Sequence, residues 1–208
     1  MGILSAIRTR KSPKVPAPGE AGSRGAGRTA FDELSRASAL LSSGTDFGEL
    51  ESILVEQACD ITRSDLAALY LYTGDPRDPK TPLRLSYKRG PWSVPASLAR
   101  SGEALSFLED CGEAAVLNRR RPCALEGILL HPEMASGMAL PVAVPKAAVG
   151  ILFVNARTEN HYDRIRLNFL GSFCALAAGM LRSSRLFQEL KEHVAVIESL
   201  ERYQESVF

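Results

Sequence analysis

The chain has 208 residues, a formal net charge of +1 and 45% hydrophobic residues, a composition typical of soluble globular proteins. It contains no run of about 18 apolar residues, so the sequence predicts no membrane-spanning helix. Its four cysteines, Cys59, Cys111, Cys123 and Cys174, form no Cys-x-x-Cys pair, which argues against a zinc site and favours a reducing cytoplasm. We expect Cys59 and Cys174 to be buried thiols, because apolar helical segments surround them.

Residues 1–28 contain six basic residues and one acidic residue, a balance of +5, and the part from residue 8 onwards is rich in Pro, Gly and Ser. Such a segment cannot bury an apolar core, so we expect a disordered basic tail. A solvated tail is the simpler interpretation. The alternative is a peripheral contact with anionic lipid, helped by Ile3, Leu4 and Ile7, whereas no nucleic-acid partner is expected.

Two helices are expected after the tail. The first covers Thr29–Ser43, in which apolar residues recur on one face, and Gly44 marks its end. The second begins at Asp46, with Glu49 three residues later in the spacing of a capping box, and continues to Ile61.

Two strands follow these helices. The first is the apolar segment Leu66–Tyr72, and a loop rich in Gly, Asp and Pro separates it from the second, Leu83–Lys88. In the second strand Leu83, Leu85 and Tyr87 alternate with polar residues. We therefore expect these three side chains on one face of a sheet.

The middle of the chain is irregular. It predicts short helices at Glu103–Glu109 and Gly112–Arg119 and a short extended piece at Cys123–Leu125. Beyond the middle, Ser136–Val144 and Ala148–Asn155 are apolar runs separated by a turn that contains proline. This pattern predicts a β-hairpin.

The last quarter of the chain, Tyr162–Phe208, contains no proline and predicts one helix, about 70 Å long at about 1.5 Å per residue. Its first half is rich in small residues that suit packing on a domain, and its second half carries many charges around a thin apolar stripe. Apolar residues recur at alternating steps of four and three, the spacing of a coiled coil. We expect a parallel homodimer through a seam formed by Phe173, Leu176, Met180, Phe187, Leu190, Val194 and Ile197. The alternative is a long amphipathic helix folded back on its own domain.

The order of helix, strands, irregular middle, hairpin and long helix indicates an α+β fold. At the hairpin, Met138–Val144 and Ala148–Asn155, followed by His161-Tyr-Asp-Arg-Ile165, resemble the last strands and the start of the final helix of a GAF domain. The helix and strand expected within 46–73 resemble the opening of that family, and Gly112-Glu-Ala-Ala-Val116 resembles its middle.

This resemblance covers roughly residues 30–185. It implies a central antiparallel sheet of about six strands, with terminal helices on one face and a ligand pocket on the other. The chain then divides into a tail (1–28), a GAF-like domain (29–185) and a C-terminal coiled-coil signalling helix (186–208).

The same resemblance implies a non-catalytic sensory or regulatory domain that binds a small molecule or a partner. The signal would pass through the dimeric C-terminal helix to an effector. Glu198–Phe208 also resembles the helix that leads into a PAS domain of sensor histidine kinases, which points to a two-component system.

The implied pocket would draw its residues from the irregular middle and the sheet, and aromatic rings with a few polar groups suit a planar ligand. The candidate ligand-binding residues are Tyr70, Tyr72, Tyr87, Trp92, Phe107, Cys111, Glu126 and Met138. The sequence identifies neither the ligand nor a cofactor, and a structural dimerisation module with an empty pocket is the alternative. Cyclic-nucleotide binding is not supported, because Asn155 is followed by Ala156 and the Asp-Glu pair of such GAF domains is absent.

An enzymatic interpretation is a further alternative, since some GAF proteins are free methionine sulfoxide reductases. Their chemistry needs one cysteine to attack the sulfoxide and others to resolve the product as a disulfide. Cys111-Gly112 resembles one of those positions, but the Gly-His-Ile-Ala-Cys run of those enzymes is missing. Phosphate-binding loops and nucleophile elbows are also absent, so the sequence predicts no catalytic residue and no metal ligand.

Overall fold

The computed structural model describes residues 35–36, 39, 46–76, 78, 80–100, 104–106, 108, 114–120, 122–145 and 147–207, and their side chains except those of 124 and 198–207. The predicted tail at 1–28 lies outside the described residues. So does most of the helix predicted at Thr29–Ser43, of which Ser35, Arg36 and Ala39 are described and are helical.

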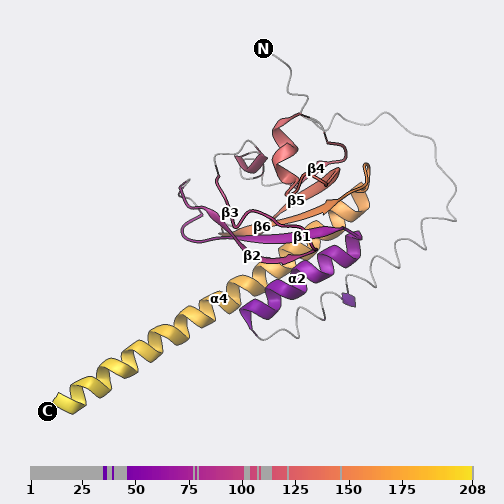
Figure 1. The fold of residues 1–208 in the computed structure, drawn as a ribbon. Coiled ribbons are helices and arrows are strands. Elements are labelled where there is room, and N and C mark those ends of the chain that lie inside the picture. Colours follow the sequence, from indigo (N-terminus) through magenta and orange to yellow (C-terminus); the bar gives the residue numbers. More distant parts are fainter. Residues whose placement is uncertain are drawn as a thin grey trace.

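A six-stranded antiparallel sheet forms the centre of the domain, in the order β3-β2-β1-β6-β5-β4 (Figure 1). Its strands are β1 (Leu66–Tyr72), β2 (Leu83–Arg89), β3 (Ser97–Leu98), β4 (Ala115–Leu117), β5 (Ser136–Val144) and β6 (Ala147–Ala156). β1 and β6 are central and buried on both faces, which accounts for their nearly continuous apolar sequences. The predicted α+β fold with such a sheet is confirmed.

Two helices cover one face of this sheet (Figure 1). α2 (Phe47–Thr62) begins where the Asp46 carboxylate accepts a hydrogen bond from the N–H of Phe47 (2.8 Å), and it ends at Arg63, whose backbone is left-handed (φ 52°). α4 (Arg164–Val207) has 44 residues; its first part packs on the sheet beside α2 and its second part projects from the domain. Within the described part of the chain, no helix combines the length and apolar character needed to cross a membrane.

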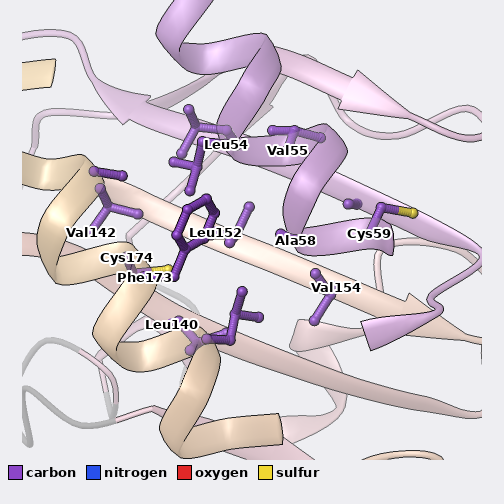
Figure 2. Close-up of a cluster of buried hydrophobic side chains, with 14 of the residues drawn as sticks. Leu54, Val55, Ala58, Cys59, Leu140, Val142, Leu152, Val154, Phe173 and Cys174 are labelled. Carbon is purple, nitrogen blue, oxygen red and sulfur yellow. The ribbon is translucent and has the colours of Figure 1, made fainter. Parts of the chain in front are cut away.

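The core between the helices and the sheet is built from apolar side chains at helical spacing. Small residues of α4, Ala177 and Ala178, are completely buried and let this helix lie close to the strands. Figure 2 shows side chains of both helices meeting those of the central strands, among them Leu54, Val55 and Ala58 of α2, Phe173 and Cys174 of α4, and Leu140, Val142, Leu152 and Val154 of β5 and β6.

Cys59 of α2 and Cys174 of α4 lie in this core, which confirms that both are buried thiols. Burial raises the pKa of Cys59 to about 11 and that of Cys174 to about 12, because apolar surroundings disfavour the thiolate. The Cys59 thiol donates to the carbonyl oxygen of Ser64 (3.0 Å). Both groups are therefore neutral at physiological pH and lack the thiolate that a nucleophile requires.

Strand β2 contains a bulge that reverses the direction of Tyr87. Leu69 lies opposite Tyr87, but Tyr70 lies opposite Leu85, so Ser86 has no residue opposite it. The extra residue shifts the alternation by one, and Tyr87 therefore joins Leu69 on the helix side of the sheet. The prediction that all three apolar residues of this strand share one face is wrong for Tyr87.

The irregular middle differs from the sequence prediction in its short elements. β4 (Ala115–Leu117) lies within Gly112–Arg119, for which the sequence predicts a helix. Pairing with Gly137–Ala139 at the edge of β5 outweighs the local helix propensity of these residues. The 3₁₀ helix η1 (Ala124–Ile128) stands where the sequence predicts an extended piece at Cys123–Leu125. The two-residue strand β3 carries no pattern long enough to predict.

Other predicted elements are confirmed. β5 has the predicted bounds, Ser136–Val144, and β6 begins one residue earlier and ends one residue later than predicted. The helix predicted at Glu103–Glu109 is helical at each of its described positions, 104–106 and 108.

Gly150 of β6 lies against the backbone of β1, where an added Cβ atom would overlap the carbonyl oxygen of Tyr70 and lie 3.0 Å from the Cα atom of Leu71. We predict that Gly150→Ala lowers the free energy of unfolding by about 2 kcal/mol, the cost typical of overpacking. Gly171→Ala in α4 is the matched control, because nothing lies within 4 Å of its Cβ position. It should raise stability by about 0.5–1 kcal/mol, since Ala is the better helix former. Urea denaturation measures both changes, and equal effects would contradict the packing described.

The raised thiol pKa values predict a loss of stability at alkaline pH. Above the unfolded pKa, near 9, the unfolded chain releases the Cys174 proton, whereas the folded chain keeps it until the pH approaches about 12. The free energy of unfolding therefore falls in this range, by up to about 1.4 kcal/mol per pH unit. The free energy of unfolding, measured by urea denaturation, should fall less between about pH 8 and about pH 10 in Cys174→Ala than in the wild type. Cys123→Ala removes an exposed thiol and should keep the wild-type dependence; an unchanged fall in Cys174→Ala would refute the prediction.

Candidate functional site

The sheet face away from α2 and α4 contains a cavity at one end, which we call the hollow. It has a volume of about 280 Å³ and is lined by Tyr72, Pro76, Arg100, Leu108, Pro141, Ala143, Ala148, Gly150 and Ile151. These residues come from the end of β1 and the loop after it, from the β5–β6 hairpin and from the irregular middle. The hollow is on the face for which the sequence resemblance implies a ligand pocket.

The hollow exists because a bulge places small side chains opposite one another in the hairpin. Ala143 of β5 lies opposite Ala148 of β6, and Val142 lies opposite Gly150, so Val149 has no residue opposite it. Neither alanine extends beyond its Cβ atom, and they therefore leave space above this end of the sheet.

The hollow stops where large side chains fill the same face. Tyr70 and Phe153 pack edge to face, with ring centroids 5.6 Å apart, and both are fully buried. The Tyr70 hydroxyl donates to the carbonyl oxygen of Pro95 (2.7 Å), and burial raises the pKa of Tyr70 to about 12. This aromatic pair forms the wall of the hollow and separates the hollow from the remaining apolar core on this face.

A single charged side chain is present among the described residues that line the hollow. The guanidinium of Arg100 lies over the ring of Tyr72, with its Cζ atom 5.2 Å from the ring centroid. Its Nη1 atom donates to the carbonyl oxygen of Asp78 (2.6 Å) in the loop after β1. The carboxylate of Asp78 instead accepts the backbone N–H of Lys80 (2.9 Å). These two contacts hold the guanidinium of Arg100 at one side of the hollow.

The opposite end of the same face is occupied by Trp92. Its Nε1–H donates to Glu133 (2.9 Å), and the guanidinium of Arg157 lies 5.5 Å from the ring centroid. Arg157 is held in turn by the carboxylate of Asp65 (3.2 Å), and the ring of His131 lies 6.5 Å from that of Trp92. These contacts hold Trp92 at the end of the sheet where β1 begins and β6 ends, away from the hollow.

The eight residues predicted from the sequence as ligand-binding do not form one site. Tyr72 lines the hollow, and Tyr70 contributes to the wall beside it. Tyr87 and Met138 lie on the helix side of the sheet, where the bulge in β2 and the pairing of β5 with β6 direct them. Glu126 lies in η1, with its carboxylate 3.8 Å from Nη1 of Arg120.

Phe107 and Cys111 lie outside the described residues. The residues that sequence reasoning missed are Arg100 and the small residues of the hairpin, chiefly Ala143 and Ala148. Arg100 belongs to no periodic pattern. The small residues on both sides of the Pro145 turn could have indicated a hollow, because facing alanines cannot fill a core layer.

Asn155 has a structural role. Its side chain is completely buried, its Oδ1 atom accepts the N–H of Leu130 (2.8 Å), and its Nδ2 atom donates to the carbonyl oxygens of Ile128 and Val154 (both 2.9 Å). The amide thereby holds the segment after η1 against the sheet. Gly137 leaves the necessary room, because an added Cβ atom there would lie 2.5 Å from Nδ2.

A larger depression of about 410 Å³ lies where α4 leaves the domain. Acidic and basic side chains both line it, among them Glu51, Arg84, Arg185 and Glu189, and the last two form an ion pair (3.2 Å). Burial raises the pKa of Glu51 against the opposing effect of a hydrogen bond with Ser86. These mixed charges give the depression no clear preference for an anion or a cation, so we take the hollow as the candidate site.

Within the described parts of the chain, no three His, Cys, Asp or Glu side chains form a group that could hold a metal ion. Of the described cysteines, Cys59 and Cys174 are on the helix side and Cys123 is exposed. None of these three lines the hollow.

Neither the family models nor the curated proteins compared with the sequence gave a match. Solved structures do match. The GAF domain of an Acinetobacter phosphoenolpyruvate-protein phosphotransferase is 20% identical over 76% of this chain and 95% of its own, with a TM-score of 0.62. Free methionine-R-sulfoxide reductase from Neisseria meningitidis is 16% identical over 80% and 95%, with a TM-score of 0.63. The chromophore-binding domain of a bacteriophytochrome from R. palustris is 11% identical over 76% and 63%, with a TM-score of 0.56. The chain therefore has the GAF fold.

Proposed function

We propose that the chain is a sensory or regulatory domain that binds a small molecule in the hollow and passes the signal along α4 of a homodimer. The observation that carries this proposal is that α4 has two separate apolar faces, one buried in its own domain and one exposed. The enzymatic alternative depends on Cys111, which lies outside the described residues, and the sequence lacks the Gly-His-Ile-Ala-Cys run of the reductases.

The buried face of α4 is formed by Leu170, Phe173, Cys174, Ala177, Ala178 and Leu181. The exposed face runs along another side of the helix and comprises Ile165, Leu176, Phe187, Leu190, Val194 and Ile197. These six side chains are between 42% and 66% exposed. An apolar stripe of this length on a projecting helix is the surface that a second helix would cover.

The predicted seam needs one correction. Phe173 is completely buried against the sheet of its own domain, because it belongs to the first apolar face of α4. Met180 is half-buried and packs at the edge of the same core. Leu176, Phe187, Leu190 and the residues beyond them are exposed, and they remain the proposed seam.

A parallel arrangement fits this stripe best. The stripe begins at Ile165, where α4 lies on the domain, and continues to Ile197 in the projecting part (Figure 1). In a parallel, in-register pair the two stripes would meet along their whole length. An antiparallel pair would instead place the projecting part of each α4 beside the domain of the other protomer.

The proposed relay crosses the sheet. Ala143 of β5 faces the hollow, and its neighbours Val142 and Val144 pack toward α4 on the other face. α4 is close at this point, since an added Cβ atom at Gly179 would lie 4.0 Å from Val144. A ligand that favours one position of β5 would thereby favour one position of α4, and the seam would carry that preference to an effector.

We propose a histidine kinase or another two-component protein as that effector. We place it in the cytoplasm, where the described free thiols would be stable.

The dimer is tested by Leu190→Glu. This change would place two carboxylates between apolar stripes, so we expect the dissociation constant to rise at least about 100-fold. Light scattering should give twice the 22.5 kDa chain mass for the wild type and the single chain mass for the variant. Gln188→Glu adds the same charge beside the depression, on another side of α4, and should remain dimeric. A monomeric wild type at micromolar concentration would refute the proposal.

The sensory function is tested by native mass spectrometry of the protein purified from its own host. We expect a dimer that carries a small-molecule adduct, and we expect Ala143→Leu to lose the adduct because the larger side chain would fill the hollow. A clean dimer without an adduct would favour the structural dimerisation module instead.

A further inference from the structure

We propose that the depression where α4 leaves the domain is a second binding site, and that it takes a small organic amine. The ammonium group lies on the carboxylate of Glu51, and the apolar body of the ligand covers the apolar side chains beside it. This site is separate from the hollow. Of the described residues that line the two cavities, Tyr72 alone is common to both.

The proposal starts from Glu51, a buried carboxylate in the wall of the depression. Glu51 is 8% exposed, and it receives a hydrogen bond from the hydroxyl of Ser86, which also lines the depression. It forms no ion pair within the described part of the chain. A carboxylate offers about four acceptor sites, and acidic groups are rarely buried without a partner. Glu51 therefore has acceptor capacity that a ligand in the depression can use.

The electrostatic surroundings of Glu51 favour a positive partner. Burial raises the pKa of Glu51, the Ser86 hydrogen bond opposes this shift, and the negative charge of Asp46 adds to it. Of the two arginines that line the depression, Arg185 is paired with Glu189 on α4 (3.2 Å), and Arg84 is exposed. An ammonium group beside Glu51 offsets the cost of burying its charge.

The exposed charges of the depression do not decide between an anion and a cation. Arg84, Arg185, Glu189 and Glu192 carry both signs, and all four side chains are exposed to solvent. Solvent and salt weaken the interactions of such groups, whereas a charge in a buried wall is screened much less. The buried carboxylate of Glu51 therefore determines which ligand charge is favoured.

The apolar part of the lining favours an organic amine over a metal ion. Phe47, Leu71 and Leu85 line the depression and are only half-buried, so a ligand with a hydrocarbon body removes their exposed carbon atoms from water. A metal ion gains nothing from these side chains, and the described residues contain no group of three acidic, His or Cys ligands. The volume of about 410 Å³ lies within the range for small-molecule pockets, about 300–1,000 Å³.

A ligand in the depression contacts the domain and the projecting helix at once. Leu181 is the last buried residue among the described side chains of α4, and Arg185, Gln188 and Glu192 line the depression beyond it. The opposite wall belongs to α2, β1 and β2. A bound amine thus favours one position of the projecting part of α4 relative to the domain.

Three compounds with one carbon skeleton test the proposal by calorimetric titration of the full chain at about pH 8, where the amine is protonated. 2-Phenylethylamine carries the ammonium group, 2-phenylethanol is neutral, and phenylacetate carries a carboxylate. We expect the amine to bind at least about tenfold more tightly than the other two, the ratio expected for a hydrogen bond to a charged group. Equal or tighter binding of the alcohol or of phenylacetate, or no binding of the amine at about 10 mM, would overturn the proposal.

A variant of Glu51 tests the anchor. Glu51→Gln keeps the size and the hydrogen-bonding capacity of the side chain, so it should weaken binding of 2-phenylethylamine at least about tenfold and leave 2-phenylethanol unchanged. Glu49→Gln is the matched control, because it removes an exposed carboxylate of the same helix that does not line the depression. Urea denaturation establishes that both variants fold. A preference for the amine that survives Glu51→Gln shows that Glu51 is not the anchor.

The location of the site is tested by hydrogen exchange and by Ala143→Leu. Bound 2-phenylethylamine should slow amide exchange at the start of α2 and around Gln188 of α4, the two helical walls of the depression. Ala143→Leu fills the hollow and should leave binding of the amine unchanged. Protection confined to the hollow, or loss of amine binding in Ala143→Leu, would overturn the second site. The sensory proposal stands or fails separately, with the adduct from the host that depends on Ala143.

Discussion

The central strands of the sheet are buried on both faces, so this sheet has to be covered twice. Seven consecutive residues of β1 are apolar, and six of them are buried. Polar and apolar residues do not alternate along this strand, so neither of its faces is suited to solvent. One cover comes from α2 and α4, and the other comes from the segments between β2 and β5. The helical cover packs regularly, whereas the second cover consists of loops and short elements and leaves the hollow.

Two bulges decide which side chains reach each cover. At Ser86 the extra residue turns Tyr87 toward α2, where its hydroxyl lies 3.3 Å from Glu56. At Val149 the extra residue brings Ala143 and Ala148 together on the other face. In both strands a one-residue shift moves every later side chain to the opposite face. The candidate site thus depends on the local register as much as on residue type.

The elements predicted correctly are those with a long local pattern. The hairpin of β5 and β6 follows from two uninterrupted apolar runs, and the start of α2 follows from the N-cap at Asp46. The sequence does not reveal β4, because three residues carry no period and their pairing with β5 is a tertiary contact. The bulge at Ser86 is equally invisible, since Leu83, Leu85 and Tyr87 alternate as an unbroken strand would. For this reason the sequence placed Tyr87 in the site beside Tyr72. Met138 was also placed there, although its regular pairing with Val154 directs it to the helix side.

Arg100 illustrates why the site was harder to predict than the fold. It follows a two-residue strand and belongs to no motif, so its position over Tyr72 arises only when the loop after β1 and the middle segment meet. A core position repeats with the period of its helix or strand, but a binding residue on a loop has no such period. The apolar stripe of α4 is the opposite case, because its period is visible in the sequence from Leu176 to Ile197.

The arrangement of hollow, β5 and α4 also limits how a signal could pass. A ligand shifts an equilibrium between two packings of α4 only by the difference in its affinity for them. A tenfold difference corresponds to about 1.4 kcal/mol, and a nearly complete switch needs about 5.5 kcal/mol. One hydrogen bond to a charged group contributes about 1.5–3 kcal/mol, so a ligand held by one such bond would shift a single protomer only in part. In a parallel dimer two hollows act on one seam, and their contributions add because both α4 helices must change together. The exposed stripe of α4 is therefore as important for a usable response as the hollow itself.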